Sequence, residues 1–310
     1  MTRHRSRAAL LLVLLPLLWG QASHAATTLA DQPVFASADV PGNLALALSV
    51  EYPTAISVAN LGNYADASTY LGYFDPAKCY TYAYNSTTPA SSYFQPAGLA
   101  TGTNSHSCSG KWSGNFMNWA TMQTIDPFRW ALTGGYRVVD STTETILQKA
   151  WGSSQGSQSN FPLRGTSQVT STGHNLASGL VSSVVPMSWT AFNTSVWKRG
   201  NTMVFSGTGT SYSNTGVAGT DWQSATISND ATATYRVYVR VKVCDSSSAA
   251  GGVERNCVLY PNGQYKPEGL MQSNANKIRY SAFSYLNGDG VSTQGAVLRA
   301  PMGFIGPTYP

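Results

Sequence analysis

An apolar run near the amino end of the chain, GNLALALSVEYPT at residues 42–54, breaks off at Glu51 and Pro53. A short, continuous apolar run that ends in this way predicts a buried β-strand reaching the edge of a sheet. In open α/β sheets, ligand sites form at the carboxyl ends of such strands. Residues 49–53 are therefore a candidate site, either for a metal, for a substrate or for neither.

A second strand is predicted by strict alternation of apolar and polar positions, which gives one buried face and one solvated face. The apolar face consists of Tyr235, Val237, Val239, Val241 and Val243, and the other face of Arg236, Tyr238, Arg240 and Lys242. The basic row fits a solvated or edge-protecting face, with an anionic glycan or protein partner as the alternative. Residues 136–139 and 278–286 predict a short strand and a buried strand.

Helical spacing appears in residues 114–135, GNFMNWATMQTIDPFRWALTGG. Proline cannot continue a helix, but it fits the first position of a new one, and Asp126 is a favourable N-cap residue. The segment predicts two short buried helices with a bend at Ile125–Asp126. The second helix should end in a left-handed cap at Gly134-Gly135.

Two further helices are expected downstream. Ser141 and Glu144 have the spacing of a capping box, which predicts a helix from Thr142 to Trp151. The segment KPEGLMQSNANK, residues 266–277, predicts a short helix.

Residues 60–112 and 152–231 are rich in small and polar residues and tyrosine, and they show little periodicity. Such composition is typical of loops and short strands, so both segments are predicted to be exposed β-rich insertions in an α/β (α+β) fold. If they are exposed, trimming residues 153–230 should leave a folded domain and change only what it contacts.

The first 25 residues predict a secretory signal peptide cleaved after Ala25, with three arginines, an apolar core of about a dozen residues and a small-x-small site. The core is too short to span a membrane, and no later stretch is long and apolar enough. Removing Arg3, Arg5 and Arg7 leaves 16 of the 19 basic residues against 14 acidic ones. No basic block of the kind that tracks phosphates remains, so nucleic acid is not expected as a partner.

The four cysteines form an even set in a chain predicted to be exported, which favours disulfides over metal thiolates. Three pairings are possible. We favour Cys79–Cys108 and Cys244–Cys257, because each pair would close a loop rich in serine and glycine. Reduced structural cysteines are the alternative.

No catalytic constellation stands out. Ser154 lies in a G-x-S-x-G match, but no acidic residue separates it from His174, the last histidine, so the hydrolase order is absent. His106 and His174 are too few for a histidine-rich metal centre. Asp126 and Asp140 could meet as paired carboxylates, although nothing singles them out. We therefore expect no enzyme, no catalytic residue and no cofactor.

Several segments, taken in order, resemble the N-terminal region of the PilC/PilY family of type IV pilus biogenesis proteins and tip-associated adhesins. The segments are PGNLALAL, CYTY, WSGNFMNWATMQTIDPFRWALTGGYRVVD, ERNCVLYPNGQYKPEGLMQ and IRYSAFSYLN. The resemblance covers most of residues 26–310, and residues 152–231 are its weakest part.

The resemblance implies a von Willebrand A-like sheet whose first strand, in many members, ends in a metal-binding Asp-x-Ser-x-Ser. The matching positions here are Ser49 to Pro53, where only Ser49 and Glu51 offer side-chain oxygens. We therefore expect a degenerate sheet without that metal site. The family's calcium site belongs to a C-terminal β-propeller, which is absent from these residues, and the sequence leaves open whether the chain is a fragment of a longer protein.

The resemblance also implies a non-enzymatic role in pilus assembly, surface attachment or twitching motility. Minor pilins or other pilus components would be the partners, with host or surface ligands as further candidates. The location would be the periplasm, the outer membrane surface or the pilus tip. A secreted carbohydrate-binding or carbohydrate-active β-rich module is the alternative, because tyrosine and tryptophan are abundant.

Overall fold

The computed structural model of this protein describes residues 41–48, 57–151, 164–166, 175–196, 200–207, 219–285 and 296–306. The chain divides into two compact units, residues 1–40 and 41–310, and all described residues belong to the second. Four features considered from the sequence lie outside the described residues: the predicted signal peptide at residues 1–25, the candidate site at residues 49–53, Ser154 and His174.

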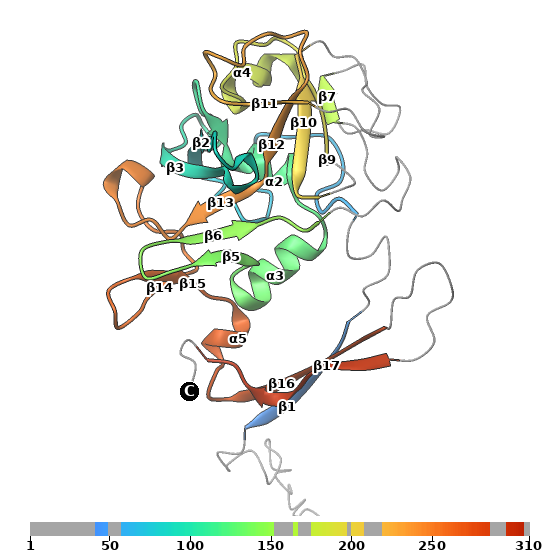
Figure 1. The fold of residues 1–310 in the computed structure, drawn as a ribbon, viewed down its shortest axis with the longest axis vertical. Helices are drawn as coiled ribbons and strands as arrows, with labels where there is room; N and C mark the ends of the chain where they lie inside the picture. The colour runs from blue at the N-terminus through green and yellow to red at the C-terminus, as the bar shows by residue number, and fades with distance from the viewer. Residues whose placement is uncertain are drawn as a thin grey trace, which may run out of the picture. The chain divides into compact units, whose positions relative to one another are not determined.

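Among the described residues, two mixed sheets have six strands each (Figure 1). The strands of the first, in spatial order, are β4 (Trp112–Ser113), β2 (Lys78–Ala83), β3 (Tyr93–Leu99), β13 (Arg240–Val243), β6 (Thr145–Gln148) and β5 (Arg137–Asp140). Those of the second are β11 (Thr220–Asp221), β12 (Tyr235–Tyr238), β10 (Thr202–Ser206), β9 (Asn193–Val196), β7 (Arg164–Thr166) and β8 (Asn175–Leu176). A separate hairpin joins β14 (Cys257–Leu259) to β15 (Tyr265–Pro267).

The described helices are short. They are α2 (Gly114–Thr121), α3 (Ile125–Thr133), α4 (Val181–Val184) and α5 (Leu270–Ser273), with 3-10 turns at Pro89–Ser91, Ser178–Leu180 and Ser248–Ala250. The predicted mixed α/β class is confirmed, as are the two helices in 114–135 and the short helix in 266–277. None of the described helices has the length and apolar character needed to cross a membrane.

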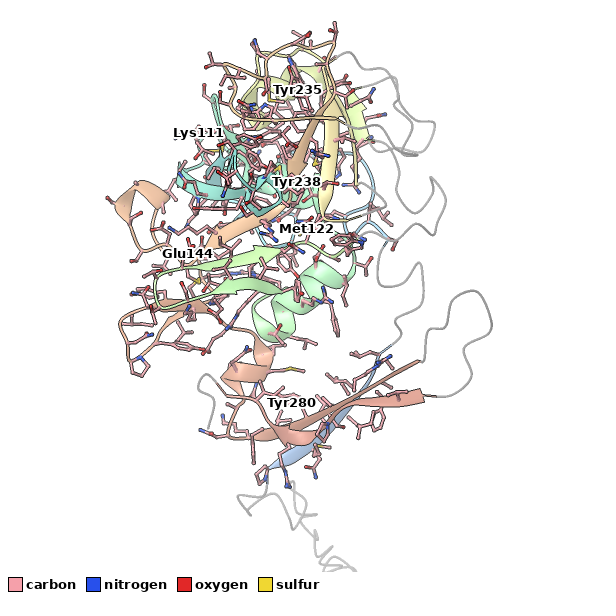
Figure 2. All side chains as sticks on the ribbon, viewed as in Figure 1. Lys111, Met122, Glu144, Tyr235, Tyr238 and Tyr280 are labelled. Atoms are coloured by element: carbon pink, nitrogen blue, oxygen red, sulfur yellow. A yellow bond between two sulfur atoms is a disulfide. The ribbon has the colours of Figure 1, made fainter. Side chains whose placement is uncertain are left out.

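The alternating segment is confirmed, and it supplies strands to both large sheets. Figure 2 labels Tyr235 and Tyr238 on β12, which pairs with β10, while β13 pairs with β6. The apolar face is buried throughout, as predicted. The basic face is partly paired, because Arg236 and Lys242 form ion pairs with aspartates at 2.7 and 3.1 Å.

The prediction of exposed insertions is wrong for the described parts of residues 60–112 and 152–231. Trp112, from the first insertion, packs against Phe205 and Trp222 of the second, with ring centroids 5.1 and 5.4 Å apart. All three rings are buried in the main core. A few aromatic residues bury a large apolar area, so a segment that is polar on average can still carry core residues.

The helix predicted from Thr142 to Trp151 is also wrong, because Thr145–Gln148 forms β6 instead. Ser141 does cap, but it caps a turn: its Oγ accepts from Glu144 N–H at 3.1 Å, and Ser141 N–H donates to Glu144 O at 3.0 Å. Glu144 therefore lies at the tip of the β5–β6 hairpin (Figure 2). Pairing of β6 with both β5 and β13 outweighs the local helix signal.

The break between the two predicted helices lies at residues 122–124, and Asp126 is not the N-cap. The first turn of α3 contains Asp126, whose carboxylate accepts from Gln123 N–H at 3.0 Å and from Ala150 N–H at 2.7 Å. A buried N–H requires an acceptor. By accepting from Ala150, this aspartate joins the start of α3 to the residues that directly follow β6. Gly134 has a φ of 79°, which confirms the left-handed cap.

Lys149 lies beside this buried carboxylate, and its Nζ donates to Gln123 Oε1 at 2.6 Å and to Ala150 O at 2.9 Å. Burial lowers the pKa of Lys149 from 10.5 to about 8, and the nearby Asp126 charge opposes this shift. Between these two values the unfolded chain binds a proton that the folded chain does not, so stability should rise with pH, by up to about 1.4 kcal/mol per pH unit.

The measurement is urea unfolding between pH 7 and 10 for the wild type and for Lys149→Met. Above about pH 8 the wild type should gain stability relative to the variant. The subtraction removes the contribution of groups common to both proteins. A constant difference across this range would show that Lys149 keeps its proton in the folded state.

A third described sheet contains β1 (Gly42–Leu48), β16 (Ile278–Tyr285) and β17 (Ala296–Phe304), with β1 parallel and β17 antiparallel to β16. Both predicted strands are present, but the expected burial of β1 is wrong. Leu44 is 43% exposed, and exposed apolar side chains also occur on the other two strands, so a face of this small sheet is not covered by the described residues. In β16, Tyr280 is buried whereas Phe283 is exposed, so only part of that strand is covered.

Candidate functional site

A cavity of about 390 Å³ lies between the 69–76 segment, helix α3 and the loop at 253–256. Its lining is largely apolar and includes Tyr73, Phe74, Trp130, Leu147 and Val243. Ligand pockets in proteins have this size and character. We call this cavity, together with an adjoining hollow described below, the groove.

Two buried asparagines of α2 hold the first wall of the groove. Asn118 Oδ1 accepts from Phe74 N–H at 3.1 Å, and its Nδ2 donates to Tyr70 O and Phe74 O, both at 2.8 Å. Asn115 Oδ1 accepts from Tyr70 N–H at 2.8 Å. These amides satisfy backbone groups of an irregular segment that would otherwise be left unpaired on burial. The two Asn positions of the GNFMNWATM motif thus have a structural role.

The close approach between α2 and this wall requires glycine at two positions. A Cβ at Gly72 would lie 2.3 Å from Asn118 Oδ1, and one at Gly114 would lie 2.1 Å from Asp75 O. Neither distance is possible for real atoms, so any larger side chain would push the wall away from the helix.

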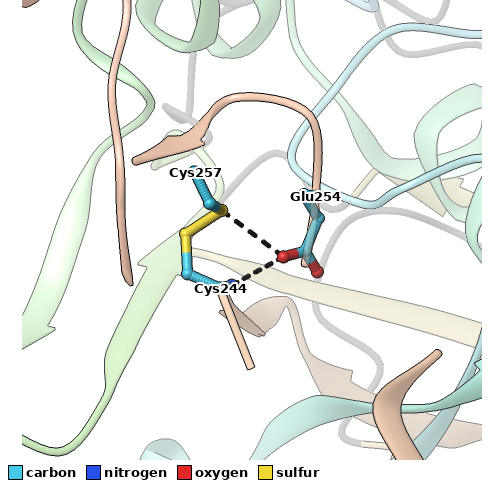
Figure 3. A group of neighbouring side chains, drawn as sticks. All are labelled: Cys244, Glu254 and Cys257. Atoms are coloured by element: carbon cyan, nitrogen blue, oxygen red, sulfur yellow. Dashed lines mark hydrogen bonds between the residues drawn. A yellow bond between two sulfur atoms is a disulfide. The ribbon is translucent and has the colours of Figure 1, made fainter. Parts of the chain in front are cut away.

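The opposite wall is a loop closed by the Cys244–Cys257 disulfide (Figure 3). Glu254 faces this bond: its Oε2 accepts from Cys244 N–H at 2.7 Å and lies 3.4 Å from Cys257 Sγ. Cys244 has a φ of 60°, a left-handed conformation that is unfavourable for residues with a Cβ. The disulfide and the carboxylate together hold the backbone in this conformation.

Lys78 completes the anchoring of the loop. Its Nζ is 3.0 Å from Glu254 Oε1 and also donates to Gly252 O. Both charged side chains are buried, at 2% and 7% exposure. The three residues Cys244, Glu254 and Cys257 are close enough to suggest a metal site. In the disulfide form, however, neither sulfur is a thiolate, and Lys78 and a backbone N–H already occupy the carboxylate.

The second disulfide joins Cys79 to Cys108. The two bonds are the pairs that the sequence analysis favoured. Cys108 N–H also donates to Ser183 O at 2.7 Å, which ties this loop to the segment around α4.

Arg255 lies at the rim, where its guanidinium carbon is 5.3 Å from the centroid of the Trp130 ring. Beyond this pair lies an adjoining hollow of about 470 Å³, lined by residues of α3, β14 and α5. Trp130, Arg255 and Asn256 line both hollows. The groove therefore extends to both sides of the Arg255–Trp130 pair.

The other residues considered from the sequence have structural partners away from the groove. His106 is buried with Nδ1 2.6 Å from Asp66 O. Asp126 binds backbone N–H groups, as described above. Asp140 pairs with Arg137 and Lys266, and the hydrogen bonds from these cations help to lower its pKa against the effect of burial. The two aspartates thus have separate partners.

Sequence reasoning missed Lys78, Glu254 and Arg255. The only local signal for the last two was their position between two cysteines that were expected to pair. For Lys78 there was none, because its partner Glu254 is 176 residues away along the chain.

Comparisons with known proteins cover most of the chain. A family model described as "PilY1 homolog, small alpha/beta domain" matches residues 62–161, which include the first wall of the groove and α3. A curated protein of Xylella fastidiosa (strain Temecula1), named type IV pilus biogenesis factor PilY1 homolog, is 44% identical over 296 residues. That alignment covers 93% of this chain and 23% of the relative.

A second protein of the same name and organism is 37% identical over 94 residues, which is 30% of this chain and 6% of the relative. This chain therefore spans less than a quarter of the length of either relative. No solved structure matches it.

Proposed function

Because this chain is a relative of the PilY1 homologs, as its resemblance to the PilC/PilY family implied, we propose that it acts in type IV pilus biogenesis as a binding protein without enzymatic activity. The observation that carries the proposal is the 44% identity over 93% of the chain. The partners would be minor pilins or other pilus components, with surface or host ligands as further candidates. Its place would be the periplasm, the outer membrane surface or the pilus tip.

The geometry of the groove supports binding in preference to catalysis. Three carboxylates line the groove, those of Asp75, Glu254 and Glu268. The buried one, Glu254, is already committed to Lys78 and to the backbone of Cys244. A general base needs a free proton-accepting atom within reach of a substrate, and this carboxylate does not offer one.

The alternative of a carbohydrate-active module rested on the abundance of aromatic residues. Four of the tryptophans, Trp112, Trp119, Trp189 and Trp222, are buried in the main core. A buried ring cannot stack on a sugar at the surface, so these residues support a packing role instead.

The sheet β1-β16-β17 is proposed to belong to a degenerate von Willebrand A-like sheet without a metal site at residues 49–53. Support comes from the parallel pairing of β1 with β16, since sheets with parallel strands are normally covered on both faces by helices. The exposed Leu44, Phe283 and Leu298 fit such a cover. A solved structure of a longer relative in which the equivalent of β1 remains an uncovered edge would contradict this assignment.

Deletion of the gene in its host is expected to lower surface piliation and twitching, because a biogenesis factor acts before fibres reach the surface. Pili would be counted by electron microscopy, twitching by the spreading of colonies, and attachment in a separate assay. Complementation with the full gene should restore all that is lost. Normal pili, twitching and attachment in a deletion strain without a redundant paralogue would rule out the pilus role.

A further inference from the structure

We propose that the groove binds a polypeptide segment of a partner protein, one that presents an apolar side chain next to a carboxylate. The inference deepens the proposed function and rests on it only in treating this domain as a binding module. It is carried by three observations: an apolar cavity, a cation without an acidic partner at its rim, and a second hollow that continues the first.

The cavity is suited to an apolar side chain. Aromatic and aliphatic residues dominate its lining, and the polar Asn118 in it is already saturated by backbone partners. An aromatic or branched side chain that enters such a space gains favourable free energy by leaving water, and this gain scales with the apolar area buried.

Arg255 is suited to a carboxylate. It is the one cation among the described lining residues of the two hollows. Within the part of the chain that the structure describes, the Arg255 side chain stacks on Trp130 and forms no ion pair or hydrogen bond. Stacking fixes the plane of the guanidinium, which then presents a rigid fork to a carboxylate.

A phosphate group is a poorer fit at the same place. It carries nearly two negative charges, whereas the groove offers a single arginine and also contains Asp75, Glu254 and Glu268. A single carboxylate matches the single unpaired cation.

The adjoining hollow favours an extended chain over a small molecule. Val258 and Leu270 line it and are 45% and 59% exposed. A chain that crosses the Arg255–Trp130 pair places its apolar anchor in the more enclosed cavity of about 390 Å³ and covers Val258 and Leu270 with its next side chain. Linear contacts of this kind, with a side chain in a pocket, are common in peptide recognition.

The test uses the purified protein and three blocked dipeptides: acetyl-Phe-Asp-amide, the isosteric acetyl-Phe-Asn-amide and acetyl-Gly-Asp-amide. Binding is followed by NMR, with the indole N–H signal of Trp130 assigned by means of Trp130→Phe. We expect the Phe-Asp peptide to shift this signal and to bind about three- to tenfold more tightly than the Phe-Asn peptide, as one added charge-assisted contact would give. The Gly-Asp peptide should bind more weakly than either.

A matched pair of variants locates the effect. Arg255→Gln should reduce the affinity for the Phe-Asp peptide to that for the Phe-Asn peptide. Arg129→Gln removes a similar arginine, which stacks on Tyr136 at 5.1 Å outside the groove, and should change neither affinity.

Three outcomes would overturn the inference: equal affinity for the Asp and Asn peptides, binding that Arg255→Gln leaves unchanged, or no binding at Trp130 by any of the three. None of these outcomes would affect the piliation experiment, which does not use the groove. If deletion of the gene removes pili but the purified protein does not bind the peptides, the pilus role stands and the proposed ligand of the groove is wrong.

Discussion

Removal of residues 153–230 is expected to abolish folding of the domain. The deletion takes away β7 to β11, and so five of the six strands of the second large sheet, together with the core residues Trp189, Phe205 and Trp222. Their partner Trp112 would be left without most of its aromatic neighbours. The truncated protein should show no cooperative thermal transition by circular dichroism. The expectation that this segment can be trimmed assumed that it is exposed, and the buried rings of Trp189, Phe205 and Trp222 contradict that assumption.

Point substitutions within the same segment measure how much its buried residues contribute to the stability of the core. Phe205 packs against Trp112, Trp189 and Tyr235, and Phe205→Ala should cost about 3–5 kcal/mol in the free energy of unfolding. Ile227 is 68% exposed, and Ile227→Ala should change stability by no more than about 0.5 kcal/mol. Equal effects of the two substitutions in urea unfolding would show that the insertion does not contribute to the core.

Lys78→Met is expected to destabilise the protein by about 3–5 kcal/mol, because it leaves the buried carboxylate of Glu254 without its counter-charge. That carboxylate also fixes Cys244 in its left-handed conformation, so the loop that forms one wall of the groove should loosen. Urea unfolding measures the loss of stability. Faster hydrogen exchange at residues 253–256 would report the movement of the wall.

Lys242→Met is the matched control for this substitution. Its ion pair with Asp245 has a similar distance of 3.1 Å but is partly exposed, so its loss should cost less than about 1 kcal/mol. Adding Glu254→Gln to Lys78→Met should recover part of the stability, because the unpaired charge is removed. A cost for Lys78→Met no greater than that for Lys242→Met would mean that water reaches Glu254 in the folded protein.

A core variant and a groove variant together distinguish loss of the fold from loss of binding in the groove. A host strain that carries the Phe205→Ala protein should lose function through misfolding. One that carries the Arg255→Gln protein should keep the fold and lose only what the groove binds. Comparing piliation with attachment in these two strains would show whether the groove serves assembly or a later contact.

The sequence by itself determined those features that depend on neighbours along the chain. The period of two from Tyr235 to Val243 identified the buried face of that strand, because successive side chains of a strand point to opposite faces. The Asp-Pro pair and Gly134 separated and ended the helices around Trp119 and Trp130 to within a few residues. The order of characteristic segments sufficed for the resemblance to the PilC/PilY family, which the relatives confirm.

Only the tertiary structure decided which segments meet. Ser141 and Glu144 do have the spacing of a capping box, yet the segment that follows them is a strand. It pairs with β13, where Arg240 lies opposite Gln148 although the two are 92 residues apart along the chain. Lys78 and Glu254 find each other across 176 residues, and the groove is formed by segments as distant as Tyr70 and Arg255. Local patterns specify a period and a buried face, whereas the partner of that face is chosen by packing and pairing over the whole chain, which no local window contains.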